Sequence, residues 1–444
     1  LKTATHLLSG LVGSEMCIRD RSSQCDWPRP RRLEPNHRKR EPLMNEILSD
    51  LRIVDLSMGW AGPLAARHLA DMGAEVIKVE GCVRFDWWRS WEATQEWIDD
   101  NGAEKSVAYL YANRNKLDIT LDLETERGRE LLLKLVSKSD ALIENFSGGT
   151  LQKLNLSYEE IREANEQIVM LSMPAFGSDG PWAEFRAYGS TIEHSSGLPH
   201  LNGWPDDPPT MQHVALGDSI AGLNGVAAML TALEHKSRTG EGQFIDLNQA
   251  ECLFPLAVHG ILQQSVEGNS FDRYGNSHPD YAPYGVYPCS GEDNWILIQV
   301  FDEPEWERLK QMTDLNYDNL SDRLQRRDQL NKELAEWTSK KDKKELMKEL
   351  QRAGICASIL NNSSELLKDP QLLDRNYVQW LERDFVGTIP HPSTPYRPGK
   401  EPIPIYKPCL LYTSPSPRDQ RGSGVAAGGW KKKGGGGGGG GGGG

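Results

Sequence analysis

Asp218 is the residue whose type and position point most directly to chemistry. It stands in the run ALGDSIAGL, residues 215–223, directly before a long apolar stretch with helical character. An Asp in that position commonly caps a helix by accepting hydrogen bonds from backbone N–H groups. The N-terminus of a helix also stabilises negative charge, and an ionised carboxylate is the form that attacks a thioester. We therefore expect Asp218 to be an N-cap residue that can also serve as a covalent nucleophile.

Three further groups of residues have both a chemical and a structural interpretation. Gly59 and Gly62 follow a short strand, but the GxGxxG pattern of dinucleotide sites is absent, and a tight strand-to-helix turn explains them as well. Glu193 and His194 could form an acid–base couple or be ordinary polar residues of a helix. His278 lies in a segment rich in Asn, Pro and Gly that could line a pocket or only make turns.

The elements that would position these residues alternate between strand and helix. The hydrophobic pattern predicts strands at 51–57, 74–80, 116–123, 141–146 and 168–176, and helices at 64–73 and 124–140 and from Ser157. Ser157 and Glu160 have the spacing of a capping box. This alternation predicts an α/β fold with a mostly parallel, Rossmann-like sheet, in which ligands bind at the loops beyond the carboxyl ends of the strands. The loops at 58–63 and 145–149 are therefore the expected binding loops.

The remaining chain predicts a second, smaller domain. We place the N-terminal part of a large domain at 44–245 and a small α+β domain with its linkers at 246–352. The charged amphipathic segments between 302 and 354 read as helices of the small domain. Residues 353–408 are expected to return to the large domain, with a strand near 354–360 and a helix at 369–382.

The two ends of the chain do not resemble folded protein. Residues 1–43 are rich in Arg and Pro without periodicity, and residues 409–444 end in a run of glycines. Both resemble translated adapter sequence, so we treat them as a non-native leader and a non-native tail. Basic residues outnumber acidic ones in both, so residues 44–408 are more acidic than the whole chain, whose formal charge is −13.

An acidic surface limits the possible partners. It repels nucleic acid and anionic lipid, so we expect neither nucleic-acid nor membrane binding. No apolar run approaches the ~20 residues that span a bilayer. Cys82, Cys252, Cys289 and Cys356 are far apart and form no CxxC pair, which argues against a zinc site and suits reduced thiols. We expect a cytoplasmic protein with no metal.

Five segments, taken in order, carry a resemblance to a known family. They are LRIVDLSMGWAGPLAARHLADMGAEVIKVE (51–80), NRNKLDITLDLETERGRELL (113–132), ALIENFSGGTLQKL (141–154), ALGDS (215–219) and TALEHKSRTGEGQ (231–243). Together they resemble the family III CoA-transferases, of the CaiB/BaiF type, over about residues 50–400. The resemblance implies a large Rossmann-like domain built from both chain ends, a small domain between them, and a homodimer whose two subunits interlock like links.

The resemblance also implies a reaction and a set of contacts. Asp218 matches the family's nucleophile, which takes the acyl group and then CoA covalently while CoA passes from an acyl-CoA to a carboxylic acid. No metal and no tightly bound cofactor is implied, because coenzyme A or acyl-CoA enters as substrate. The family's CoA contacts fall on Met58, Ala61, Leu121, Asn145, Phe146, Lys153 and Arg186. Lys153 and Arg186 could bind CoA phosphates, or be solvated surface charges, and Phe146 could face the adenine or be a core residue.

Two residues depart from the family's formyl-CoA transferases. Trp60 stands where those enzymes carry Gln and Gly189 where they carry Glu, which makes formyl transfer doubtful and suggests a bulkier, more apolar acyl group beside Trp60. Related acyl-CoA racemases carry a GHD run where this chain has Tyr188 and Gly189. A racemase or epimerase therefore stays as an alternative only if another pair, such as Glu193 and His194, acts as acid and base. An inactive CoA-binding homologue is a further alternative.

Overall fold

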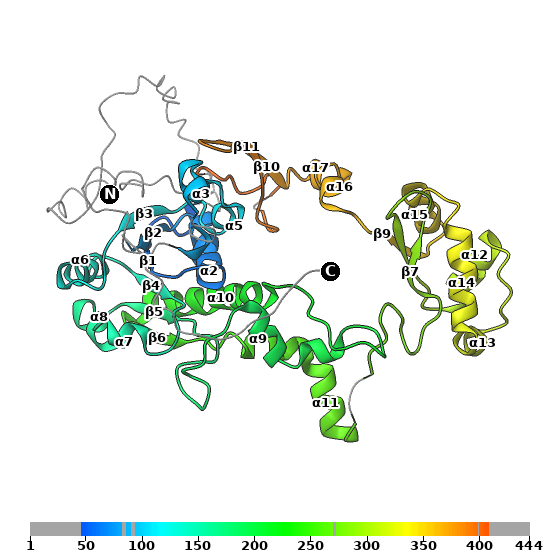
Figure 1. The fold of residues 1–444 in the computed structure, drawn as a ribbon, viewed down its shortest axis with the longest axis horizontal. Helices are drawn as coiled ribbons and strands as arrows, with labels where there is room; N and C mark the ends of the chain where they lie inside the picture. The colour runs from blue at the N-terminus through cyan, green and yellow to red at the C-terminus, as the bar shows by residue number, and fades with distance from the viewer. Residues whose placement is uncertain (1–45, 82–85, 90–93, 270–271, 398, 408–444) are drawn as a thin grey trace.

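The computed structural model describes residues 46–81, 86–89, 94–269, 272–397 and 399–407 (Figure 1). The leader and the tail that we set aside lie outside these residues, as does Cys82. The description below is confined to the described ranges.

A six-stranded parallel sheet forms the centre of the large domain. Its strands are β1 (Arg52–Asp55), β2 (Glu75–Glu80), β3 (Leu117–Thr120), β4 (Ala141–Glu144), β5 (Val169–Ser172) and β6 (Gln243–Asp246), in the order β3-β2-β1-β4-β5-β6. The predicted Rossmann-like α/β fold is confirmed. The chain winds outward from β1 to β3 and then from β4 to β6, so the loops after β1 and β4 adjoin at the switch point, where such sheets bind ligands.

Helices cover both faces of this sheet because neighbouring strand residues point to opposite sides. Ile53 packs with α2 (Ala61–Asp71) and α10 (Leu216–Thr239), whereas Val54 packs with α6 (Glu126–Val136) and α8 (Tyr158–Ala164) (Figure 1). The capping box of Ser157 and Glu160 forms at the start of α8, as predicted.

Helix α10 lies very close to α2. A Cβ added at Gly222 would come within 2.9 Å of the Ala61 carbonyl oxygen, so the glycine permits this approach. By length and composition alone α10 could cross a membrane, but it packs against α2 and β5 within the large domain. The packing accounts for its apolar, small-residue sequence.

The small domain has its own sheet and its own core. Strands β7 (Tyr284–Pro288), β8 (Trp295–Gln299) and β9 (Cys356–Ile359) pair in antiparallel order, against α12 (Glu303–Met312), α13 (Leu320–Gln325), α14 (Arg327–Thr338) and α15 (Lys343–Arg352). The strand expected near 354–360 therefore exists, but it completes this small sheet, because β8 offers it a free edge. The chain turns back toward the large domain only after β9.

The prediction of one helix over 369–382 is wrong. Helix α17 (Pro370–Asp374) stops after five residues, Asn376 adopts a left-handed φ of 48°, and β10 (Val378–Arg383) follows. β10 pairs with β11 (Gly387–Pro392), a partner that lies beyond the window that suggested a helix. The amide N–H groups of Tyr406 and Lys407 then donate to the Asn115 side-chain oxygen, at 3.1 and 3.0 Å, and join the C-terminal segment to the large domain.

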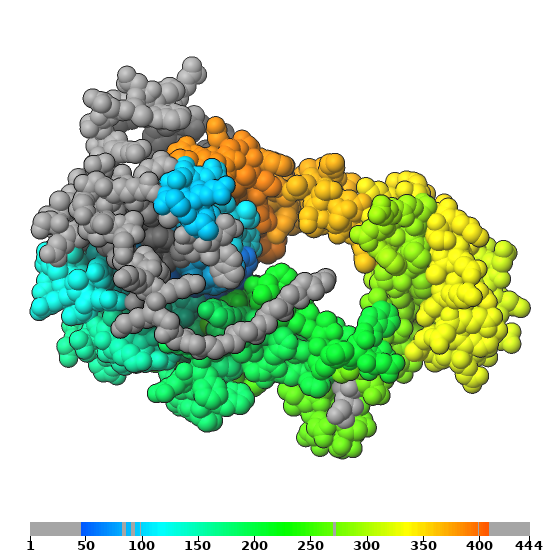
Figure 2. Space-filling model, in the orientation of Figure 1, coloured from blue at the N-terminus to red at the C-terminus, as the bar shows by residue number. Residues whose placement is uncertain are grey.

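The remaining helical segments belong to the large domain or to the connections that border an opening through the molecule (Figure 2). They are η2 (Trp87–Arg89), α3 (Gln95–Asp99), α4 (Gly102–Lys105), α5 (Val107–Ala112), α7 (Thr150–Lys153), α9 (Gly189–Ser195), η3 (Leu198–Leu201), η4 (Glu251–Ala257), α11 (Val258–Glu267) and α16 (Ser363–Leu366). The large domain, the small domain and the two segments that connect them enclose this opening (Figure 2).

Candidate active site

Asp218 lies in the first turn of α10, three residues after the N-cap, which is Ala215. The prediction that Asp218 is the N-cap is therefore wrong, because the helix begins two residues before it, at Leu216. Burial raises the pKa of the Asp218 carboxyl to about 6, although the backbone N–H groups of Asp218 and Gly189 lower it. Desolvation thus outweighs the helix N-terminus, which we had expected to favour the ionised form. The carboxylate is still the major form at neutral pH.

Gly189, the first residue of α9, packs directly on Asp218. A Cβ at this position would overlap the Asp218 carboxylate and lie 2.7 Å from the Val214 carbonyl oxygen. Sequence comparison singled out Gly189 as a departure from a family pattern, and the structure gives a physical reason for a glycine here. The residue leaves the space that the carboxylate occupies.

Trp60 reaches the other side of the same turn. Its indole N–H donates to the Ser219 hydroxyl oxygen at 3.0 Å, and Ser219 follows Asp218 in α10. The indole is half-buried and stacks on Tyr111, with ring centroids 5.3 Å apart. The structure therefore brings Trp60, Gly189 and Asp218 together, and their role as an acyl site stays a prediction.

The loops after β1 and β4 are joined by a pair of hydrogen bonds. The Met58 amide donates to the Asn145 side-chain oxygen, and the Asn145 amide group donates to the Met58 carbonyl, both at 2.8 Å. Two of the predicted CoA contacts thus lie at the switch point of the sheet. A third, Ala61, is fully buried at the start of α2, its backbone included.

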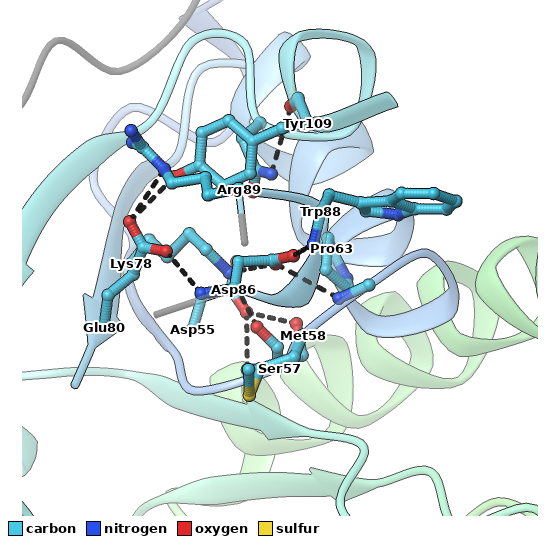
Figure 3. A network of polar contacts seen from close by, with 12 residues as sticks. Asp55, Ser57, Met58, Pro63, Lys78, Glu80, Asp86, Trp88, Arg89 and Tyr109 are labelled. Atoms are coloured by element: carbon cyan, nitrogen blue, oxygen red, sulfur yellow. Dashed lines mark hydrogen bonds and ion pairs between the residues drawn. The ribbon is translucent and has the colours of Figure 1, made fainter. Parts of the chain in front are cut away.

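A buried network of charged residues holds the first loop in place (Figure 3). Asp86 accepts the Gly59 amide at 3.1 Å and pairs with Lys78 at 3.3 Å, and Lys78 donates to the Ser57 carbonyl at 2.6 Å. Desolvation alone would lower the pKa of Lys78, but Asp86 and other buried carboxylates hold it above its ordinary value. Lys116 reaches the loop from the other side, 2.8 Å from an Asp55 oxygen and 2.9 Å from the Pro63 carbonyl.

The network was not predicted from the sequence. The only signal is that β2 and the segment before β3 place lysines among buried strand residues, where an unpaired charge is very costly. Such positions imply buried acidic partners somewhere in the chain. They do not say which ones.

The remaining predicted CoA contacts have different surroundings. Leu121 is a core residue after β3, only 2% exposed, whereas Phe146 packs partly on the core and also lines a surface cavity. Lys153, at the end of α7, and Arg186 are exposed, and neither forms an ion pair with another described residue. Gly148 packs against the Ala183 carbonyl, which places the loop after β4 beside the segment that carries Arg186.

The cavity beside Phe146 has a buried carboxyl group. Its lining comes from the loop after β4, α7 and the ends of β5 and β6. Burial raises the pKa of Glu144 to about 7, despite hydrogen bonds from the Ser172 hydroxyl and from the Phe146 amide at 2.8 Å. Glu144 was not among the predicted site residues, because its position in a buried strand gave no chemical signal.

The structure does not join Glu193 and His194 into an acid–base couple. The Glu193 carboxylate is fully buried and accepts the backbone amides of Gln212 and His213, at 2.6 and 3.5 Å. The His194 ring is exposed, with Nδ1 2.6 Å from the Ser190 carbonyl oxygen. Glu193 is thus engaged by the backbone of the segment that precedes α10, and His194 by the preceding turn of its own helix.

His278 belongs to the small domain. Its ring lies 4.7 Å from that of Tyr281 and 5.2 Å from that of Tyr284, the first residue of β7. β7 lies across the opening from α10 (Figure 1), so the chain does not bring His278 to Asp218. Within the described part of the chain, no group of three or more His, Cys, Asp or Glu side chains is placed to hold a metal ion.

Comparisons with known proteins agree with this geometry. The family model described as CoA-transferase family III matches residues 48–409. The chain is 32% identical to a succinate–glutarate CoA-transferase of Agrobacterium fabrum, over 84% of this chain and 92% of that one. It is also 32% identical to a succinyl-CoA:mesaconate CoA-transferase of Haloarcula hispanica, over 74% and 84%. A solved CAIB/BAIF family protein from Brucella suis has 30% identity and a TM-score of 0.73, over 85% of this chain and 98% of that one.

Proposed function

Because the chain belongs to CoA-transferase family III, and is thereby a transferase of CoA, we propose that it works through covalent intermediates on Asp218. The observation that carries the proposal is the surroundings of this carboxylate. It is ionised at neutral pH yet poorly solvated, and it lies on α10, which packs on α2 just after the β1 loop of the sheet's switch point. A nucleophilic carboxylate needs this combination.

The reaction proceeds in four balanced steps. The Asp218 carboxylate attacks the thioester carbonyl of the donor, which forms a mixed anhydride and releases CoA as a thiolate. The thiolate then attacks the Asp218 carbonyl, which gives an aspartyl-CoA thioester and frees the donor acid. The incoming carboxylate attacks that thioester and displaces the thiolate again. Finally the thiolate attacks the acyl carbonyl of the new anhydride, which releases the new acyl-CoA and restores the Asp218 carboxylate.

The contacts of CoA follow from the two joined loops. The backbone of Met58 and the side chain of Asn145 would line the path of the pantetheine arm toward Asp218, with the buried Ala61 packed behind them. Phe146 would face the adenine beside its cavity, with Leu121 supporting that region from the core. Lys153 and Arg186 are exposed cations without partners among the described residues, so they can pair with the CoA phosphates.

A homodimer completes the proposal. The two domains and their connections enclose an opening (Figure 2), and an interlocked arrangement requires such an opening. Helix α11 has no buried residue in the single chain, and Ile261, Leu262 and Val266 on it are 51%, 57% and 81% exposed. Apolar surface of this kind usually marks an interface.

The test is to trap the intermediate. The protein is incubated with acyl-CoA donors, treated with hydroxylamine, digested and analysed by mass spectrometry, beside an Asp218→Ala control. We expect a hydroxamate on Asp218 in the native chain and none in the control. Modification that persists in Asp218→Ala, or no modification while acyl transfer proceeds, would contradict the covalent role of Asp218.

A further inference from the structure

Five aromatic side chains form a continuous row beside Asp218. In spatial order they are Tyr111, Trp60, Trp88, Trp87 and Tyr188, which we call the aromatic row. Successive ring centroids lie 5.3, 6.3, 4.1 and 6.1 Å apart. The residues come from four separate segments of the chain, so the row is a product of the fold.

The row is attached to the turn of Asp218 near both of its ends. Trp60 donates its indole N–H to Ser219, the residue after Asp218. Tyr188 precedes Gly189, whose α-carbon lies against the Asp218 carboxylate. An acyl group bonded to Asp218 would therefore lie beside these rings.

The row is not simply part of the hydrophobic core. Tyr188 is 72% exposed, and the other four rings are half-buried. Gly59 permits the close approach of Trp87, since a Cβ there would overlap the indole. The row thus presents flat apolar faces that are still accessible next to a reactive carboxylate.

The charges around Asp218 also favour an acyl group without a second carboxylate. Among the described residues, burial and two backbone N–H groups account for the shift of its pKa, and no described cation is among the causes. Arg67 lies 4.4 Å from the Tyr111 ring, but it is 3% exposed and also faces Asp71. In the part of the chain that the structure describes, no accessible cation would pair with a second carboxylate placed near Asp218, and an unpaired charge there is costly.

We propose that the acid carried on Asp218 is an aromatic monocarboxylic acid of the arylalkanoic type, and not a dicarboxylic acid such as those in the names of the relatives. The inference rests on the proposed transferase function and specifies its substrate class. Aromatic rings stack at centroid distances of about 4.5–7 Å, and such pairs are stabilised beyond what the area they bury accounts for. A ring of the substrate can stack on the exposed edge of the row at a similar centroid distance.

The test is isotope exchange, because it needs only one acid at a time. The protein is given 3-phenylpropionyl-CoA with deuterated 3-phenylpropionate, and separately succinyl-CoA with deuterated succinate and glutaryl-CoA with deuterated glutarate. We expect exchange at limiting substrate to be at least tenfold faster for the aromatic pair. The Trp60→Leu variant should reduce this ratio at least fivefold, whereas Trp182→Leu, which removes an exposed tryptophan outside the row, should not change it.

Each outcome decides the proposal. Faster exchange of succinate or glutarate overturns it while leaving the transferase function intact, and loss of that exchange in Arg67→Met would assign the second carboxylate to Arg67. If none of the three acids exchanges, the result would count against the transferase function itself. In that case, binding to Asp218→Asn, followed by tryptophan fluorescence, decides the acyl preference: tighter binding of succinyl-CoA than of 3-phenylpropionyl-CoA overturns it.

Discussion

At the scale of the residue, Asp218 combines a charge with poor solvation, and these two properties oppose each other. A buried carboxyl group resists ionisation, so the folded protein holds the proton of Asp218 more tightly than the unfolded chain does. Ionising Asp218 therefore lowers the free energy of unfolding. The resulting carboxylate has few water molecules that a substrate must displace. Both consequences can be measured.

The first prediction concerns stability and pH. The pKa of Asp218 is about 6 in the folded protein against an ordinary value of 3.8. The folded state therefore binds more protons between these values, and the free energy of unfolding falls as pH rises from about 4 to about 6. We expect Asp218→Asn to be more stable than the native chain by about 2 kcal/mol at pH 7.5, discounted for the partial exposure of the group. Urea unfolding at pH 7.5 and 5 checks this, and an advantage that does not shrink at pH 5 would contradict it.

The second prediction concerns the space beside the carboxylate. Gly189→Ala adds a methyl group where the Asp218 carboxylate lies, so it should displace that side chain and cost about 1–3 kcal/mol of stability. We expect kcat for CoA transfer to fall at least a hundredfold, measured in parallel with thermal unfolding. Ser190→Ala, one residue further along α9, is the matched control and should keep both properties. Unchanged kcat in Gly189→Ala would show that the carboxylate has another position available.

These residues also show where sequence reasoning succeeds and where it stops. Asp218, Trp60 and Gly189 could be singled out because each matched or broke a family pattern, and the structure brings them together. The pKa of Asp218 could not be anticipated, because burial depends on how α9 packs on α10. Glu144 was missed for the same reason.

At the scale of the element, the joined loops after β1 and β4 are the central feature. The parallel sheet brings these loops together, because β1 and β4 are neighbours although paired residues such as Ile53 and Ala141 lie 88 positions apart in the sequence. Asn145 then fixes the backbone of Met58 through two hydrogen bonds. The buried lysines Lys78 and Lys116 donate hydrogen bonds to backbone carbonyl oxygens at the two ends of the same loop.

The third prediction tests this pair of hydrogen bonds. Asn145→Ala removes both, so the Met58 loop should lose its defined position and KM for the CoA thioester should rise about tenfold, with a smaller change in kcat. Asn145→Asp keeps the acceptor of the Met58 amide and removes only the donor, so its effect should be intermediate. Steady-state kinetics with one acyl-CoA compare the three proteins. Equal KM values would exclude a role of this contact in binding.

Elements with strong local signals were predicted well. The five strands expected in the first 176 residues, the helix over 64–73 and the capping box of α8 are all present, because their patterns are set by nearby residues. The helix expected at 369–382 failed, since β10 depends on pairing with β11. β9 was recognised as a strand but joined the sheet of the small domain, which only its pairing with β8 determines.

At the scale of the whole molecule, the chain leaves the large domain, forms a separate small domain and returns. The return is secured by contacts of Tyr406 and Lys407 with Asn115. The result is a closed outline around an opening (Figure 2), and α11, which has no buried residue, projects outward from the molecule (Figure 1). A single chain therefore exposes apolar surface that a second chain could cover.

The last prediction follows from the form of that dimer. Two interlocked chains cannot separate without opening a domain, so dilution should not dissociate them. We expect light scattering to give twice the 49.7 kDa chain mass, and mass photometry at nanomolar concentration to give the same value. Ile261→Asp should lower the denaturant midpoint of the dimer by burying a charge, whereas Lys134→Asp, an exposed change on α6, should not. A dimer that dissociates on dilution while its chains stay folded would indicate ordinary face-to-face association, and a single-chain mass at all concentrations would exclude the dimer.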